Sequence, residues 1–280
     1  ELFEFKNKNQ YNFYLLKNFD IFNLLKKNKF LKFTYLQNYD YEILKKRKYD
    51  LIINSEINNS ITKKFFQKKI EKNYNSLAHT AIINHKKIEN KTAVQIFTKH
   101  GPLAFLPLSH NKTSIVFSSD LKKKIDNKKL LEIINKFNQN YKIYQISKVE
   151  SFNIKFLVLR NYSFKNILSF GDLIHKIHPL AGQGFNMTLR DLKLLLNIIE
   201  NRINYGLEID RSTLIEFKDK SKHFNYIFGI GINLINEFFK LDSRFNGKLS
   251  DNIFSFLDSN ELFKKNSILI ADKGINFATE

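Results

Sequence analysis

The segment from Phe170 to Asp191 constrains the fold of this chain more than any other. In order, it carries Gly171-Asp172, Pro179, Gly182 and Gly184. The mostly apolar residues 166–170 before it are short enough for a buried strand, and open α/β sheets bind ligands at the carboxyl ends of their strands. A helix beginning near Gly184 points its free N–H groups back at such a ligand and favours negative charge there. We expect a ligand site made of a strand end, a glycine-containing loop and a helix N-terminus.

The composition is that of a folded protein with a strongly basic surface. The 280 residues are 43% hydrophobic, enough for a substantial core in one large domain or two intimately joined ones. With 46 Lys and Arg against 27 Asp and Glu, the net charge is +19. This charge suits nucleic acid, a membrane surface or an acidic substrate, but it equally suits a generally basic solvated surface. No recognised nucleic-acid motif accompanies it, so we expect no specific nucleic-acid partner.

The residues give little support for a metal site or for a membrane-spanning helix. The chain has no cysteine, which excludes disulfides, thiolate metal sites and cysteine nucleophiles and fits a cytoplasmic protein. The longest uncharged run, Phe224 to Asn236, is shorter than the roughly 20 apolar residues of a spanning helix. His175 and His178 are spaced like a metal pair, but Pro179 disfavours helix at His178 and no further ligand completes the set. We expect no metal, and structural roles for both histidines.

Hydrophobic periodicity predicts a mixed α/β (α+β) chain. The expected helices are 11–27, 128–140, one opening near residue 184 and one over 212–240. The expected strands are 30–36, 49–54, 78–84, 93–98, 103–108, 113–118 and 149–160. Burial under other elements is the first interpretation of the apolar segment 224–239, with membrane contact as the alternative.

The helix near residue 184 has a clear amphipathic pattern. Its apolar positions are expected to form one core-facing side: Phe185, Leu189, Leu192, Leu195, Ile199 and Ile203. Asp191 stands among hydrophobic neighbours, so it is expected to pair with a buried polar partner. Gly206 is the expected stop signal.

A family resemblance rests on two ordered stretches. The pattern Gly-Asp-x-x-His-x-x-x-Pro-x-x-Gly-Gln-Gly-x-Asn, followed by Asp191, resembles the second flavin-binding motif of the FAD-dependent aromatic hydroxylases. The segment His-Pro-Leu-Ala-Gly-Gln-Gly-Phe-Asn is most similar to the same segment in their ubiquinone-biosynthesis (UbiH/UbiF/VisC) branch. Residues 97–109 resemble that branch's strand on the substrate side of the flavin.

The resemblance implies the site residues. FAD would be bound by Gly171, Asp172, Pro179, Ala181, Gly182, Gln183, Gly184, Phe185 and Asn186, with Asp172 on the ribityl chain. The substrate side would be lined by Gly101, Pro102, Leu103 and Pro107; an ordinary sheet strand ended by prolines is the alternative for this segment. No catalytic side chain is nominated, because the cofactor carries the difficult chemistry.

The resemblance also implies an external monooxygenase. NAD(P)H would reduce FAD, and one atom of dioxygen would pass to the ring of a polyprenylated phenol. A peripheral contact with the inner membrane, or membership of a ubiquinone-biosynthesis complex, is expected with such a substrate.

Two departures from the family pattern qualify this reading. The family's Gly-x-Gly-x-x-Gly fingerprint, which receives the FAD pyrophosphate, is missing, since the first glycine here is Gly101. The family's Ala-Asp-Gly-x-x-Ser motif is represented only by 55–60, where Glu56 is longer than aspartate and Ile57 replaces glycine. The alternatives are therefore another flavoprotein of this superfamily, or an inactive remnant or binding protein.

The expected organisation follows from the resemblance. The chain is expected to be N-terminally incomplete, with an FAD-binding mixed sheet lacking its first βαβ unit, an antiparallel substrate-side sheet and C-terminal helices. The predicted domains are 1–65 (later part of the FAD-binding domain), 66–155 (substrate-side sheet), 156–210 (second flavin motif) and 211–280 (helical region).

Overall fold

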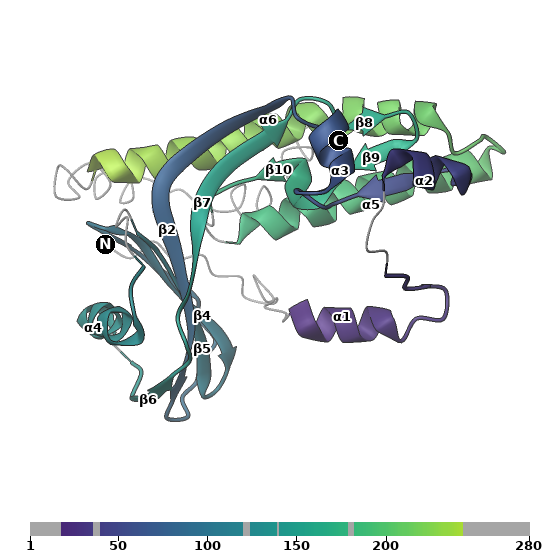
Figure 1. Ribbon diagram of the computed structural model, residues 1–280. Coiled ribbons are helices and arrows are strands. Elements are labelled where there is room, and N and C mark those ends of the chain that lie inside the picture. Colours follow the sequence, from purple (N-terminus) through teal and green to yellow (C-terminus); the bar gives the residue numbers. More distant parts are fainter. Residues whose placement is uncertain (1–17, 36–39, 120–123, 139, 179–181, 243–280) are drawn as a thin grey trace.

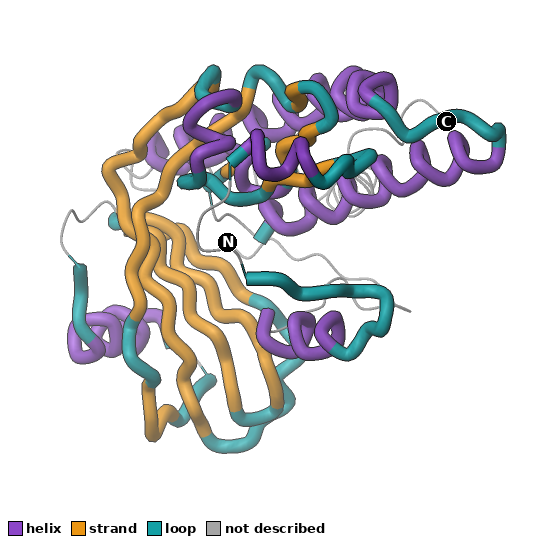
Figure 2. Tube along the Cα trace, turned by 45° about the vertical axis from the view of Figure 1, so that its right-hand side comes forward, coloured by secondary structure: helices purple, strands orange, loops and turns teal. Residues whose placement is uncertain are grey.

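Two sheets and two long helices make up most of the protein (Figure 1, Figure 2). The structure, a computed structural model, describes residues 18–35, 40–119, 124–138, 140–178 and 182–242. The expected fold class, a mixed α/β chain with an antiparallel sheet and C-terminal helices, is confirmed. The predicted domain boundaries stay predictions.

The larger sheet has seven antiparallel strands in the order β10-β7-β2-β5-β4-β3, with β6 also paired to β2. Its strands are β2 (Lys69–His85), β3 (Val94–Thr98), β4 (Gly101–Ser109), β5 (Lys112–Ser119), β6 (Ile143–Ile146), β7 (Glu150–Leu159) and β10 (His175–Lys176). Helix α4 (Asn127–Phe137) covers one face, where its Leu130 and Ile134 pack with Leu103 and Phe105 of β4. The Asp126 side chain caps α4 by accepting the Lys129 N–H.

The smaller sheet has three short strands in the order β1-β9-β8. These are β1 (Ile52–Asn54), β8 (Ser163–Phe164) and β9 (Ile167–Ser169). β1 and β9 run parallel, with Asn54 opposite Ser169. Their carboxyl ends therefore lie side by side, at the edge from which the 3₁₀ turn η1 (Gly171–Leu173) follows.

Helices α5 (Gln183–Asn204) and α6 (Arg211–Asp242) lie beside both sheets (Figure 1). One core cluster joins Leu195 and Ile198 of α5 and Phe217 of α6 to the three-stranded sheet. A second joins Met187 of α5 to β2 and β7. Three short helices lie in the described part of the first 65 residues: α1 (Asn18–Lys26), α2 (Tyr41–Lys46) and α3 (Ser60–Phe65).

Most predicted elements are present, but some predictions are wrong. Residues 30–35 form no strand, although they are rich in β-forming residues, because no other described strand pairs with them. The part of the first predicted helix before residue 18, and the C-terminal region after residue 242, lie outside the described residues. Strands 78–84, 93–98, 103–108, 113–118 and 149–160 and helix 128–140 correspond to observed elements.

The core-facing side of α5 differs from the prediction. Its buried residues are Met187, Asp191, Leu195 and Ile198. The predicted core residues Phe185, Leu189, Leu192 and Ile203 are exposed. The apolar positions of α5 form two neighbouring stripes, and only one of them meets the described sheets.

Helix α6 runs unbroken through Gly229 and Gly231. A Cβ atom at Gly229 would lie 3.2 Å from Cε2 of Phe156, so this glycine lets the helix lie close against β7. The segment 224–239 was predicted to be buried, and only part of it is. Asn225 and Gly229 are buried, whereas Tyr226, Ile227, Leu234 and Ile235 are exposed.

Candidate flavin site

The candidate site begins where β1 and β9 end together. The Phe170 N–H donates to the Asn54 carbonyl oxygen at 2.9 Å, which extends the parallel ladder by one residue. The chain then turns at Gly171, whose φ of +64° is in the left-handed region that favours glycine. The next residue, Asp172, is exposed at this strand end. This is the predicted position for a carboxylate that accepts hydrogen bonds from ligand hydroxyls.

The turn lies over the first turns of α5. A Cβ atom on Gly171 would be 3.9 Å from Cγ2 of Thr188, and one on Gly184 would be 3.8 Å from Cγ1 of Ile177. The two halves of the motif, separated in the sequence by the loop, are thus brought together. Pro179 and Ala181 of the predicted site lie outside the described residues.

The N-terminus of α5 has the properties of a ligand-facing helix end. Its N-cap is Gly182, with φ +67°, so no side chain caps the first turn and none is acidic there. A Cβ atom on Gly182 would have no neighbour within 4 Å. Of the remaining predicted residues, Phe185 is exposed and Gln183, Gly184 and Asn186 are half-buried. The free N–H groups of this turn form a site for a ligand with partial negative charge.

One buried polar atom at the site, Oε1 of Gln183, could accept a hydrogen bond from a bound ligand. The Oε1 atom of Gln183 is buried and accepts no hydrogen bond from the described part of the chain. A buried amide oxygen without a donor is costly, and a bound group with N–H or O–H donors would satisfy it. Together with the exposed Asp172 and the open space at Gly182, this agrees with a flavin at this place.

A buried network supports the site from behind. Asp191 of α5 accepts a 2.8 Å hydrogen bond at Oδ2 from His175 Nε2, and its two oxygens lie 3.0 and 3.1 Å from the Asn225 amide of α6. The expected buried partner of Asp191 is confirmed. His178 is also buried, with its ring edge-on to Tyr74 at 5.4 Å. No group of three metal-ligating side chains gathers in the described ranges.

The loop after β1 is organised by its own side chains. Asn54 donates to Thr62 Oγ1 at 2.8 Å, the Asn59 amide donates to Asn54 Oδ1 at 2.6 Å, and Thr62 Oγ1 donates to the Glu56 carbonyl at 2.6 Å. The Glu56 carboxylate accepts the Asn58 N–H at 3.2 Å. Glu56 thus closes the loop, and the role of the 55–60 motif toward a cofactor stays a prediction.

The predicted substrate-side residues of β4 divide between its two faces. Leu103 is fully buried in the core under α4. Because side chains alternate between the two faces of a strand, Pro107 lies on the same face as Leu103. Pro102 and Ala104 lie on the opposite face. There the neighbouring strands expose Phe97, Ile82 and Phe152. Of the four, Pro102 is therefore the side chain on the open sheet face.

Gly101 is close to the backbone of the neighbouring strand β5. A Cβ atom at this position would lie 2.0 Å from the Ser118 carbonyl oxygen, and its φ is +124°. It permits the close approach of β4 and β5 at the open end of the sheet.

Asn54 and Asn225 were not among the site residues predicted from the sequence. Asn225 stands in an otherwise apolar run of α6, which is a usable signal for a buried polar contact. Asn54, the last residue of a short apolar strand, carries no such signal.

Comparison with solved structures defines the class of fold. The chain is similar to PqsL of Pseudomonas aeruginosa, a probable FAD-dependent monooxygenase, with a TM-score of 0.56 at 16% identity, over 71% of this chain and 58% of PqsL. The fold is that of the FAD-dependent monooxygenases.

Sequence comparison identifies the branch. The chain is 29% identical to the ubiquinone biosynthesis monooxygenase COQ6 of Dictyostelium discoideum over 192 residues, which are 55% of this chain and 39% of that protein. It is 32% identical to the 3-demethoxyubiquinol 3-hydroxylase of Escherichia coli over 118 residues, 40% of this chain and 30% of that enzyme. No family model matches the chain.

These similarities confirm the resemblance: the chain is a relative of the ubiquinone-biosynthesis monooxygenases. The matches cover well under two thirds of the relatives' own length.

Proposed function

We propose that this chain binds the flavin ring and ribityl chain of FAD and belongs to an enzyme that hydroxylates a polyprenylated phenol in ubiquinone biosynthesis. The observation that carries the proposal is the meeting of two parallel strand ends, the Gly171-Asp172 turn and the uncapped N-terminus of α5. The names of the relatives supply the substrate class and the reaction.

Each residue of the site has a separate task. Asp172, exposed at the strand end, accepts hydrogen bonds from ribityl hydroxyls. Gly182 leaves room for the ring, and the first N–H groups of α5 stabilise negative charge on its pyrimidine edge. Gln183 Oε1 takes a donor from the ring. When bound, FAD supplies electron transfer from NAD(P)H and the transfer of one oxygen atom from dioxygen.

The open sheet face suits an apolar aromatic substrate. Phe97 and Pro102 are cross-strand partners on it, and Ala104 follows on the same face. We infer that the phenol ring lies between this face and the flavin, where little water competes with the reaction.

A membrane contact is proposed for the exposed side of α6. Ile227, Leu234 and Leu241 recur every seventh residue and are 42%, 61% and 48% exposed. Such a stripe on a chain of net charge +19 suits a lipid surface with anionic headgroups. The described helices include none that is apolar over enough of its length to cross a membrane. We propose a peripheral position on the cytoplasmic side of the inner membrane.

Vesicle sedimentation tests this contact. Leu234→Glu places a charge in the stripe, and Asn197→Glu on the polar side of α5 is the matched control. The proposal expects cosedimentation with anionic vesicles for the wild type and the control, and loss for Leu234→Glu. Equal binding of all three, or none of the wild type, contradicts it.

Product analysis tests the reaction. The chain is incubated with FAD, NADH or NADPH, a short-chain polyprenyl phenol and isotopically labelled dioxygen. The expected product carries one labelled oxygen atom on the ring. A preparation that binds FAD, leaves this phenol unchanged and hydroxylates a soluble aromatic acid belongs to another flavoenzyme class; one that folds without binding FAD is a remnant or binding protein.

A further inference from the structure

Strand β2 carries a bulge where it passes from the large sheet to the long helices, and Figure 1 shows it bending there together with β7. Asn73 and Ser76 of β2 pair with successive residues of β7. The two residues between them, Tyr74 and Asn75, are therefore extra residues in the strand. Asn75 has a φ of +52°, in the left-handed region, and its N–H donates to Asn73 Oδ1 at 3.0 Å. A bulge of this kind bends a strand and re-aims a side chain.

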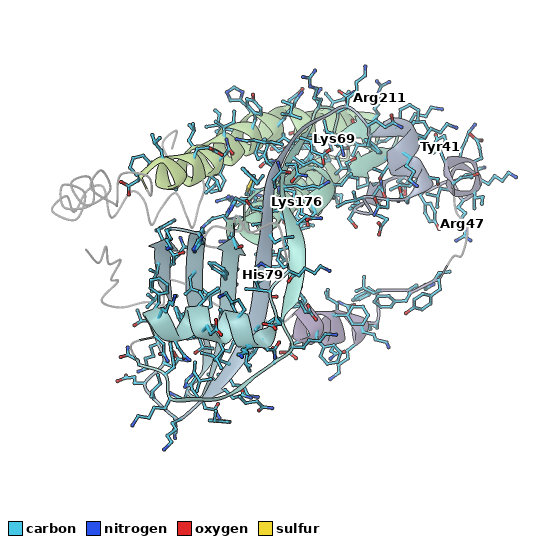
Figure 3. The ribbon with its side chains drawn as sticks, turned by 60° about the vertical axis from the view of Figure 1, so that its left-hand side comes forward. Tyr41, Arg47, Lys69, His79, Lys176 and Arg211 are labelled. Atoms are coloured by element: carbon cyan, nitrogen blue, oxygen red, sulfur yellow. The ribbon has the colours of Figure 1, made fainter. Side chains whose placement is uncertain are left out.

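The two parts of β2 on either side of the bulge belong to different parts of the protein. In Figure 3, Lys69 lies beside the long helices and His79 lies in the large sheet. Beyond the bulge, Thr80 is in one cross-strand row with Val116 and Ala104, on the open sheet face that we propose to face the substrate. One strand thus runs from the helices to the substrate side.

The side chain of Tyr74, in the bulge, is anchored to α6. Its ring is buried, and its hydroxyl donates to Asn233 Oδ1 at 2.6 Å. Lys72 Nζ lies 5.5 Å from the centroid of the ring and 3.0 Å from Glu237 Oε1. Burial, together with the charge of Glu237, raises the pKa of Tyr74 to about 12. The hydroxyl is therefore a lasting hydrogen-bond donor at neutral pH, which suits an anchor.

The flavin loop, the segment from His178 to Gly184, is connected to Tyr74 at both of its ends. At the first end, the ring of His178 meets the Tyr74 ring edge-on, with centroids 5.4 Å apart. At the second end, a Cβ atom on Gly184 would lie 3.8 Å from Cγ1 of Ile177. Ile177 belongs to the same core cluster as Tyr74. Tyr74 therefore reaches the first end directly and the second through Ile177.

We propose that Tyr74 is a positioning residue that fixes the flavin loop relative to the large sheet. The inference rests on the proposed function, in which this loop holds FAD. The hydroxyl anchors the ring to Asn233, and the ring holds His178 and Ile177 in place. Because the bulge aims Tyr74 at the loop and the same strand continues into the open sheet face, one strand sets the geometry of both the flavin side and the substrate side.

FAD titration of the full chain distinguishes this role from packing alone. Tyr74→Phe keeps the ring and removes its anchor, and Asn233→Ala removes the acceptor. Tyr144→Phe, at an exposed tyrosine of β6, is the matched control. Each of the first two variants is expected to raise the dissociation constant of FAD about threefold and to change the absorption bands of bound flavin, whereas the control is expected to do neither. The double variant is expected to bind FAD as each single variant does, because both changes remove the same interaction.

Methyl NMR of the chain without flavin reports on the loop independently of FAD binding. Tyr74→Phe and Asn233→Ala are expected to shift and broaden the methyl signals of Ile177. The methyl signals of Ile83, which is buried under α4, are the internal reference and are expected to stay unchanged.

Two results overturn the proposal. One is a set of Ile177 signals that neither variant alters. The other is a wild type that binds FAD while both variants keep its dissociation constant and flavin spectrum, because Tyr74 would then only fill the core. Altered Ile177 signals in a chain that never binds FAD would instead contradict the proposed function and support the connection between Tyr74 and the loop.

Discussion

The imidazole of His175 and the carboxylate of Asp191 are joined by a 2.8 Å hydrogen bond inside the protein, with side-chain exposures of 0% and 4%. They come from β10 and α5, on either side of the loop that holds the predicted flavin contacts. The Asn225 amide of α6 lies within hydrogen-bond distance of both carboxylate oxygens. The network therefore ties three elements together directly behind the candidate site.

Removing the carboxylate from this network is expected to destabilise the fold. Asp191→Ala leaves His175 and the Asn225 amide without their buried acceptor, and each buried donor left unsatisfied costs about 1–3 kcal/mol. Asp219→Ala, an exposed carboxylate of α6, is the control and is expected to change stability by about 0.5 kcal/mol at most. Urea unfolding near neutral pH measures both. A loss from Asp191→Ala no larger than that of the control would show that the network contributes little.

A pair of glycine substitutions tests the packing of the large sheet. Gly101→Ala forces a Cβ atom against the Ser118 carbonyl oxygen at a positive φ, and is expected to cost about 2–3 kcal/mol or more. Gly231→Ala adds its methyl group in open space within α6, and is expected to stabilise the protein by about 0.5–1 kcal/mol. Thermal unfolding should move in opposite directions for the two variants. Equal shifts would mean that the strands separate easily at Gly101.

Acid sensitivity is expected to involve His79 of β2. Burial lowers the pKa of His79 below its ordinary value of 6.5, and its Nδ1 lies 2.8 Å from Ser151 Oγ. Above pH 6.5 the residue is neutral in both folded and unfolded chains. Below it the unfolded chain takes up a proton more readily than the folded one, so the free energy of unfolding falls as the pH falls toward the lowered pKa.

Unfolding measured across this range for the wild type and His79→Gln gives the test. The wild type is expected to lose more stability than the variant as the pH falls below 6.5. Parallel curves for the two proteins would exclude His79 as the source of the acid sensitivity.

Local patterns predicted some elements well because the information lies within each segment. The start of α5 was predicted near Gly184 and lies at Gln183, and Gly206, the predicted stop signal, adopts a positive φ just after the helix ends. The alternating runs of β4 and β5 are likewise predicted by their own residues. In the site, the turn at Gly171 lies against Thr188 of α5 and Gly184 lies against Ile177, while the cofactor-binding roles of the motif residues stay predictions.

Other features depend on distant partners that a single segment does not show. β8 and β10 have two residues each and exist only because β9 and β7 pair with them. The first half of β2 is polar and was not predicted; it forms through pairing with β7. The buried side of α5 could not be chosen from periodicity, since two apolar stripes lie next to each other on that helix. Asp191 and Asn225 are 34 residues apart.

Flavin titration shows whether this chain binds FAD and whether Asp172 contributes to that binding. FAD is added to the purified chain, and quenching of flavin fluorescence and changes in the flavin absorption bands are followed for the wild type, Asp172→Ala and the surface control Asp219→Ala. We expect saturable binding that Asp172→Ala weakens and Asp219→Ala leaves unchanged, with thermal stability without flavin equal in all three. A folded wild type that leaves the flavin spectrum unaltered, or binding indifferent to Asp172, would contradict it.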